Sequence, residues 1–505
     1  MLFNSYEFLI FFLPIFLVGF FFFGRRWPIV AAAWMAVVSL VFYGWWAPRF
    51  LLLIGFSIVF NYTVGMGLGG RWRLPDFVRR GWLLTFGIAV DLGLLTYFKY
   101  GTFIVANVDA ICGLHIQWSV VLPIGISFYT FTQIAFLADA YRNVAKEFNF
   151  VHYTIFVTYF PHLIAGPILH HKDLMPQFRR REIYRPSAEN LSIGLSFFAI
   201  GLFKKVVIAD GLAPQVATYF SPAQTASLSF VVSWVAAIAY ALQLYFDFSG
   251  YSDMAIGLSR LVGVDLPINF NSPYKSLDII EFWRRWHMSL SRFLRDYLYI
   301  PLGGNRNGPV RRYANLMITM LLGGLWHGAG WTFVIWGGLH GLYLIFNHAW
   351  NAVTRRLKWR GFGGSVLGRG LSLLVTFAAV TVAWVFFRAP DLPTALHIIR
   401  GMAGLNGLGS VEVPPWFLGG MLRHVFPDSL VSEPNMRADI TLVLKCLLLL
   451  LGCVLLPNSQ DIMTHRGTGR LLWRPTWQWG LAMSLVLTIG VSLINRTTEF
   501  LYFEF

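Results

Sequence analysis

Long, predominantly apolar stretches recur along the whole of this 505-residue chain and limit its folding more than any other feature. A helix needs about 20 such residues to cross the hydrocarbon core of a bilayer. The chain shows no clear internal repeat, so the stretches predict one domain, residues 1–505, with an all-α polytopic fold of roughly ten to twelve transmembrane helices. The stretches are Phe8–Phe23, Ile29–Trp46, Leu51–Leu68, Trp82–Phe98, Val120–Ala138, Leu191–Ile208, Ser227–Phe248, Tyr313–Leu325, Ala329–Phe346, Leu371–Phe387, Ile440–Leu456 and Gly480–Leu493.

The composition agrees with a membrane protein. Charged residues make up 13% of the chain and hydrophobic residues 56%, whereas charged residues are about 25% of an ordinary soluble domain. These values exclude a disordered chain and a soluble enzyme fold. The three cysteines, Cys112, Cys446 and Cys453, form no CxxC pair and are interpreted as small apolar residues.

Three stretches do not have the pattern of simple spans. Tyr153–His171 is interrupted by proline and glycine, Gly250–Leu266 is too polar to face lipid throughout, and Asn271–Arg312 mixes Arg and Lys with Trp and Tyr. Irregular backbone at membrane depth survives only inside protein or beside water. We therefore expect re-entrant or interfacial helices around a central cavity.

The net charge of +16 is concentrated in loops. Positive residues in the loops of membrane proteins favour the cytoplasmic side. Arginines follow the first and third apolar stretches, at Arg25 and at Arg71–Arg80, which predicts an N-terminus outside the cytoplasm. By the same rule Asn271–Arg312 is cytoplasmic, and the basic charge predicts no nucleic-acid partner because no binding motif accompanies it.

The motif Trp326-His327-Gly328 lies where one apolar stretch ends and another begins. Desolvation disfavours a charged imidazole, and a neutral imidazole can accept a proton from a hydroxyl group. A histidine that only makes a hydrogen bond between helices fits the local sequence equally well.

Other histidines are less informative. His287 lies in an amphipathic Trp- and Arg-rich stretch that is typical of an interfacial anchor. His340 follows His327 by thirteen residues, about 20 Å along a continuous helix, so we expect a structural role between helices. His170 and His171 are adjacent and have basic neighbours, so no metal site is predicted there.

No nucleophile elbow, Walker A motif or His-x4-Asp box is present. The single GxGxxG match, Gly65–Gly70, closes an apolar stretch and lacks the strand that a dinucleotide site requires. Soluble-type hydrolase and nucleotide chemistry are therefore poorly supported.

Longer motifs resemble the membrane-bound O-acyltransferase superfamily, and within it the alginate O-acetyltransferase branch. They lie in the expected order along nearly the whole chain, whereas Ala389–Asp439 matches no motif and leaves the acceptor unassigned. The matching segments are Met1–Ser5, Tyr129–Tyr141, Phe160–Pro167, Tyr245–Asp253 (YFDFSGYSD), Asn269–Tyr274, Phe282–Leu290 (FWRRWHMSL), Leu294–Asn305, Leu325–Ala329 (LWHGA) and Phe500–Phe505.

The resemblance implies that His327 is the catalytic histidine and that His287 is the second active-site position, which is often asparagine in eukaryotic relatives. Tyr245, Asp247 and Asp253 are expected to line the same cavity. The implied fold is a ring of helices around a tunnel in the bacterial inner membrane. The implied reaction moves acetyl groups from a cytoplasmic donor such as acetyl-CoA, with no permanently bound cofactor, to an exported polysaccharide such as alginate, with a separately encoded periplasmic acetyltransferase as partner.

Two rival functions share these features. A transporter or flippase of a glycolipid or acyl carrier also needs many spans and buried polar groups, although inverted repeats are not visible. A subunit that only recruits a soluble acetyltransferase is the other. The basic stretch Asn271–Arg312 suits the phosphates of coenzyme A, and the rule that places positive loops in the cytoplasm explains it equally well.

Overall fold

A computed structural model describes residues 1–494 except 74, 76–77, 117, 165, 222–227, 358–364, 413–436 and 464–471. The closing motif Phe500–Phe505, residue 165 of the motif Phe160–Pro167 and residues 413–436 of the unassigned stretch Ala389–Asp439 lie outside the described residues.

Each of the twelve apolar stretches forms a helix or the greater part of one. The helices are α1 (Leu13–Gly24), α2 (Pro28–Gly44), α3 (Leu51–Leu68), α4 (Arg80–Leu95), α6 (Ile126–Tyr141), α10 (Ala188–Phe203), α13 (Phe230–Leu261), α16 (Gly308–His327), α17 (Trp331–Arg356), α18 (Val366–Arg388), α20 (Ile440–Leu455) and α22 (Trp477–Ser492).

Shorter elements connect them. The short α-helices are α5 (Gly101–Cys112), α7 (Phe150–Thr158), α8 (Phe160–Leu163), α9 (His171–Leu174), α11 (Asp210–Tyr219), α14 (Ile279–Arg285), α15 (Met288–Leu294), α19 (Leu392–Met402) and α21 (Ser459–Met463). Turns of π-helix lie at η1 (Glu7–Phe12), η3 (Thr96–Tyr100), η6 (Lys204–Ala209) and η8 (Arg295–Tyr299), and 3₁₀ turns at η2 (Pro48–Phe50), η4 (Met175–Arg179), η5 (Arg181–Tyr184) and η7 (Pro273–Lys275). Two three-residue strands, β1 (Ser410–Glu412) and β2 (Arg437–Asp439), pair in parallel.

The predicted all-α polytopic membrane fold is confirmed. Within the described part of the chain, six helical segments are long and apolar enough to cross a membrane, and three shorter apolar helices, α2, α20 and α22, accompany them. The predicted number of ten to twelve spans also includes the more polar helices such as α16 and α17. The six segments are Glu7–Gly24, Pro48–Leu68, Arg80–Cys112, Ala188–Tyr219, Phe230–Leu261 and Val366–Arg388.

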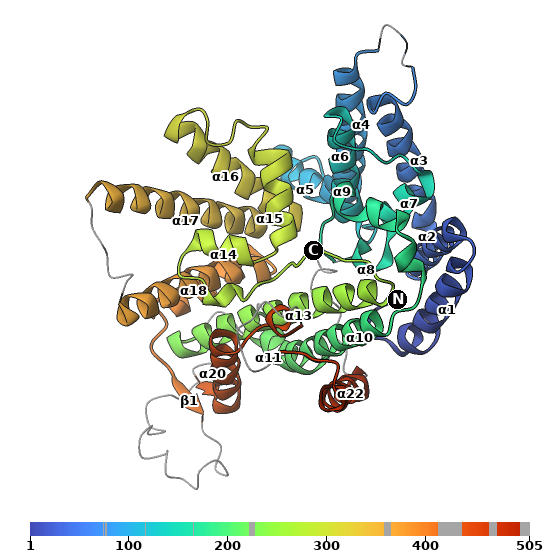
Figure 1. Cartoon of the computed structure of the whole chain (residues 1–505). Helices are drawn as coiled ribbons and strands as arrows, with labels where there is room; N and C mark the ends of the chain where they lie inside the picture. The colour runs from blue at the N-terminus through green and yellow to red at the C-terminus, as the bar shows by residue number, and fades with distance from the viewer. Residues whose placement is uncertain are drawn as a thin grey trace.

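Helix α13 lies at the centre of the fold. One prediction about it was wrong. We expected Gly250–Leu266 to form a re-entrant or interfacial helix, but residues 250–261 continue α13 without a break. This half of the helix is polar because it is buried against α10, which runs alongside it in Figure 1. Glycines make the contact: a Cβ on Gly250 would lie 2.8 Å from the Gly201 carbonyl oxygen, and one on Gly257 would lie 2.6 Å from that of Gly194.

The other two irregular stretches are broken as predicted. Tyr153–His171 divides into α7, α8 and a loop, and Asn271–Arg312 contains only short helices before α16 begins. In Figure 1 helices α14–α18 lie on one side of the molecule, helices α1–α9 lie on the other, and α13 runs below both. The functional candidates are His327 at the end of α16, His287 at the start of α15, and Tyr245, Asp247 and Asp253 on α13.

Contacts between distant segments show which helix ends share a face. The Arg80 guanidinium donates to the carbonyl oxygens of Leu68 at 2.5 Å and Tyr141 at 3.0 Å, so the ends of α3 and α6 lie beside the start of α4. At other helix ends, Met1 and Trp45 line one common depression. The alternating direction of the first helices therefore agrees with the order of charged loops in the sequence.

The glycine contact between α10 and α13 gives a stability prediction. In Gly201→Ala the new methyl group would lie 2.5 Å from the Gly250 carbonyl oxygen, and overpacking of this kind costs about 1–3 kcal/mol. We expect a lower melting temperature for the detergent-solubilised protein. Gly211→Ala is the matched control, because its methyl group meets nothing within 4 Å and alanine favours a helix. Equal melting temperatures for the two variants would refute the contact.

Candidate active site

His327 is the last residue of α16 and is buried. The helix ends because Gly328 has extended backbone and packs so tightly against Phe333 that a Cβ would lie 2.1 Å from that ring. Three aromatic rings surround the imidazole, with centroid distances of 4.9 Å to Trp326, 5.0 Å to Trp336 and 5.2 Å to Phe387. The side chain is therefore held by packing in an apolar enclosure.

His287 occupies the position before α15 with a left-handed backbone, φ 42°. Left-handed backbone is uncommon for a residue with a side chain and is retained where surrounding structure imposes it. The imidazole is fully buried, and its edge faces Phe248 at a centroid distance of 4.7 Å. Its Nδ1 lies 3.0 Å from Asn269 Oδ1, whereas Nε2 has no hydrogen-bond partner among the described residues.

Asn269 determines which nitrogen of His287 carries the hydrogen. Its Oδ1 also accepts hydrogen bonds from Ser289, from the backbone N–H at 3.3 Å and from the hydroxyl at 2.9 Å. A backbone N–H can only donate, so this amide oxygen is an acceptor and His287 Nδ1 must donate to it. Nε2 of a neutral imidazole is then left as an acceptor, directed away from Asn269.

The structure brings the two histidines together although 40 positions separate them in the sequence. Their ring centroids are 6.4 Å apart and their planes are inclined by 56°. At this spacing one small polar group between the rings can approach both imidazoles. A buried pair of basic nitrogens is suited to accepting a proton and holding the group that loses it.

His340 is closer to this pair than the sequence suggested. The estimate of about 20 Å assumed a continuous helix, but the chain breaks at Gly328–Gly330 and α17 packs back along α16. Trp336 lies between the two histidines, with centroids 5.0 Å from His327 and 4.9 Å from His340. His340 Nδ1 accepts a hydrogen bond of 3.3 Å from Trp283 Nε1, which links α17 to α14.

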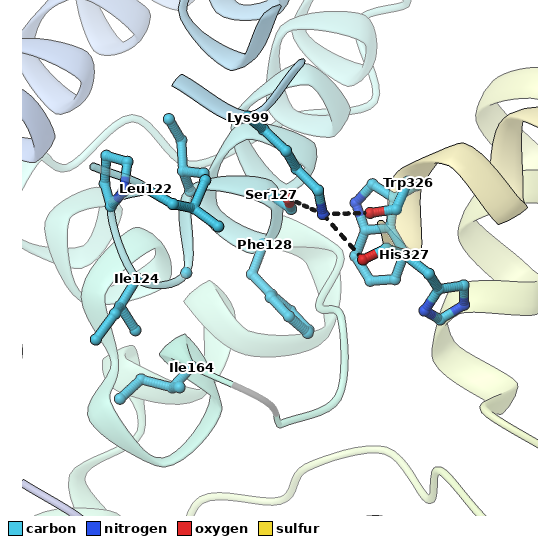
Figure 2. A pocket seen from close by; sticks show the side chains of 11 residues that line it. Lys99, Leu122, Ile124, Ser127, Phe128, Ile164, Trp326 and His327 are labelled. Atoms are coloured by element: carbon cyan, nitrogen blue, oxygen red, sulfur yellow. Dashed lines mark hydrogen bonds between the residues drawn. The ribbon is translucent and has the colours of Figure 1, made fainter. Parts of the chain in front are cut away.

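Lys99 and Tyr100 cap the end of α16, and sequence reasoning missed both. Lys99 Nζ donates to the carbonyl oxygens of Trp326 at 2.6 Å and His327 at 3.2 Å, and the Tyr100 hydroxyl donates to Leu325 at 3.0 Å. Figure 2 shows Lys99 reaching these carbonyl groups while the His327 ring points away from it. The only sequence signal was a lysine at the end of the apolar stretch Trp82–Phe98.

Two cavities reach this region. A small one of about 100 Å³ is lined by Lys99, Ser127 and the backbone side of His327. A larger one of about 830 Å³ reaches Met288 and Ser289, which directly follow His287. Its lining includes four basic side chains, Arg284, Arg292, Arg295 and His348.

The structure does not bring Tyr245, Asp247 or Asp253 to the histidine pair. Asp247 and Asp253 form ion pairs of 2.7 Å with Lys205 and Lys204 of η6, on the side of α13 that faces α10. Tyr245 lines a separate groove beside α20 and α22. One helix presents different faces to different neighbours, so Phe248 contacts His287 while Asp247 and Asp253 face η6. The Tyr245 ring lies nearer the site, with centroids 6.1 Å from Phe270 and 6.4 Å from Trp286, the residue before His287.

His170 and His171 have side-chain partners in a separate buried cluster. His171 Nδ1 lies 3.1 Å from Asp139 Oδ2, and the Tyr297 hydroxyl lies 2.9 Å from the same oxygen and 3.1 Å from His170 Nδ1. Across the ranges that the structure describes, no group of three or more His, Cys, Asp or Glu side chains is arranged to hold a metal ion.

Fold and site together define an integral-membrane protein in which broken helices enclose two histidines beside a basic cavity. Comparison with known proteins places it further: residues 95–366 match the membrane-bound O-acyltransferase family. The chain belongs to this family, and it is an O-acyltransferase.

Three relatives show its place within the family. The chain is 39% identical to the peptidoglycan O-acetyltransferase of Helicobacter pylori, over 100% of this chain and 98% of that protein. It is 43% identical to the probable alginate O-acetylase AlgI of Pseudomonas aeruginosa, over 80% of this chain and 75% of that one. Similarity to the teichoic acid D-alanyltransferase of Streptococcus thermophilus is lower, 28% over 52% of this chain and 68% of the relative.

The hydrogen bonds of Asn269 give the second prediction. Asn269→Ala leaves His287 Nδ1 and the Ser289 N–H without their acceptor, and an unsatisfied buried donor costs about 1–3 kcal/mol. We expect acyl transfer to fall by about 5- to 150-fold at an unchanged membrane level. Ser252→Ala is the control, because it removes only a 3.4 Å bond to the other end of the Asn269 amide. Full activity of Asn269→Ala would show that His287 needs no such orientation.

Proposed function

We propose that this O-acyltransferase moves acetyl groups from a cytoplasmic donor across the membrane for O-acetylation of an exported polysaccharide. The observation that carries the proposal is the buried histidine pair, 6.4 Å between ring centroids, beside a cavity with arginine in its lining. The acetyl group and the polymer acceptor come from the relatives, whose names specify acetyl transfer to peptidoglycan and alginate.

His327 is the general base in this proposal and takes the proton of the attacking hydroxyl. The hydroxyl oxygen bonds to the acetyl carbon, the C–S bond of the donor thioester breaks, and the proton passes from His327 to the leaving thiolate. His287 holds the acceptor through a second hydroxyl group, because the single hydrogen of the attacking hydroxyl goes to His327 and Nε2 is the nitrogen left to accept a hydrogen bond when Nδ1 donates to Asn269. A neutral imidazole in this tautomer cannot donate from Nε2 to the acyl carbonyl. The tautomer therefore favours contact with the acceptor over polarisation of the donor.

Acetyl-CoA is the proposed donor, and the large cavity is its proposed site. Arg284 is exposed, lines this cavity and forms no ion pair or hydrogen bond in the described part of the chain. Arg292 and Arg295 line it too but already pair with Asp173 and Asp296. A guanidinium without a carboxylate partner is suited to a phosphate group.

The proposed setting is the bacterial inner membrane, with the N-terminus in the periplasm and the large cavity open to the cytoplasm. A separately encoded periplasmic acetyltransferase is the proposed partner that delivers the acetyl group to the polymer. A transporter or flippase is the competing function, and the two differ in the fate of the donor thioester.

Cysteine labelling tests the orientation. Cys112 is exposed at the end of α5 and is expected to react with a membrane-impermeant maleimide added to spheroplasts. In a Cys112→Ser background, Arg73→Cys and Asn305→Cys are expected to react only after the membrane is permeabilised, because positive loops stay in the cytoplasm. Labelling of either position from outside would reverse the orientation and the donor side.

Replacement of the histidines tests the chemistry. General acid–base groups contribute about 10²–10⁴-fold, so His327→Ala is expected to abolish cleavage of acetyl-labelled coenzyme A by membrane vesicles and acetylation of the exported polymer. His287→Ala is expected to be severe and His287→Asn milder, because an amide keeps an acceptor. His340→Ala is expected to retain most activity, since its bond to Trp283 joins two helices.

Both readouts are normalised to the amount of protein in the membrane. A wild-type protein that leaves the thioester intact would favour the transporter. Substantial polymer acetylation by a well-expressed His327→Ala variant would remove His327 from the chemistry.

A further inference from the structure

We propose that Lys99 is a positioning residue that fixes His327 in place by holding the carbonyl end of α16. This inference rests on the proposed function, in which His327 is the general base. Lys99 lies 228 positions before His327 in the sequence and joins the residues that the reaction requires.

The three hydrogens of the Lys99 ammonium have three buried acceptors. They are the Ser127 hydroxyl at 3.2 Å, the Trp326 carbonyl oxygen at 2.6 Å and the His327 carbonyl oxygen at 3.2 Å. An ammonium group has three donors and no acceptor, so this arrangement uses its full capacity. Lys99 is only 9% exposed, and the small cavity of about 100 Å³ lies beside it.

The end of α16 needs such a group. The last four carbonyl groups of a helix have no partner within the helix, and the C-terminus carries a partial negative charge that favours a cation. Here the helix ends inside the protein beside its functional histidine. Lys99 and Tyr100 together supply donors to three consecutive carbonyl groups, those of Leu325, Trp326 and His327.

A local irregularity in the backbone accompanies this contact. Residues Thr96–Tyr100 form a turn of π-helix between α4 and α5. Turns of this kind are rare in proteins, and those that occur often lie at functional sites. It contains both Lys99 and Tyr100, and both side chains reach α16. Figure 2 shows that the lysine approaches the backbone of His327 and not its ring, so its action on the histidine is indirect.

Loss of the ammonium would release the residue that carries the reaction. Two buried carbonyl groups would lose their donor, and the last turn of α16 would loosen because unsatisfied buried groups are destabilising. The His327 ring would then no longer be held 6.4 Å from His287. The residues of α16 that line the large cavity, Leu316, Thr319 and Met320, lie before its last turn, so donor binding would be affected little.

The test is Lys99→Met, which keeps the length of the side chain but removes its charge and donors. In membrane vesicles with acetyl-labelled coenzyme A, we expect kcat to fall about 10- to 100-fold while KM for the donor changes less than threefold. Lys99→Arg is expected to recover part of kcat, because a guanidinium can still donate to both carbonyl groups. Tyr97→Phe is the matched control and is expected to stay within threefold of wild type, since Tyr97 lies in the same turn but is exposed, and its hydroxyl bonds to no described residue.

A second readout does not depend on activity. Hydrogen–deuterium exchange of the peptide that covers 321–330 is expected to be faster in Lys99→Met than in wild type. Wild-type kcat in Lys99→Met would overturn the proposal, as would a loss of activity explained wholly by a lower protein level or by a higher donor KM. If wild-type vesicles transfer no acetyl group, the proposed function fails, and unchanged exchange in Lys99→Met would then overturn the positioning role separately.

Discussion

The organisation of the centre of this protein depends on satisfying backbone groups where helices stop inside the membrane region. A helix that ends in water has solvent for its last carbonyl groups, but α16 ends between α17 and the π-helical turn before α5. Lys99 and Tyr100 provide the hydrogen bonds that water would otherwise make. Without these contacts, unpaired carbonyl groups at the end of α16 would destabilise the folded protein. Without the break at Gly328, His327 would not lie beside His287.

A group of buried ion pairs lies on the other side of α13. Lys205 lies between Asp210 and Asp247, and Lys204 pairs with Asp253, all on or against the π-helical turn after α10. Desolvation makes such pairs weak evidence for stability, whereas breaking one is strongly destabilising. They are best understood as fixing the register of α10 against α13, together with the close contact of Gly194 with Gly257 and Gly201 with Gly250.

The histidine pair therefore lies between α13 on one side and the hairpin of α16 and α17 on the other. On one side α13 and its ion pairs present Phe248 and Ser252 to His287 and Asn269. On the other side the hairpin of α16 and α17 presents His327 among three aromatic rings. Both imidazoles are excluded from bulk water. Asn269 holds a ring nitrogen of His287, and Lys99 holds the backbone carbonyl group of His327.

The sequence by itself determined the membrane class and the twelve helical stretches, because apolar length is a local property. Its resemblance to a known family, not the local sequence, pointed to His327 and His287. The sequence could not determine how α13 is buried, since the polar residues of Gly250–Leu261 look unsuited to a span until α10 covers them. It also placed Asp247 and Asp253 at the wrong site, because a motif does not say which helix face each residue occupies. The tertiary structure alone decided that Asn269 orients His287, that Lys99 holds the end of α16 and that His340 lies behind Trp336. These relations join Asn269 to His287 across 18 positions, Lys99 to His327 across 228, and His340 to His327 across 13. They depend on where helices break and on which faces meet.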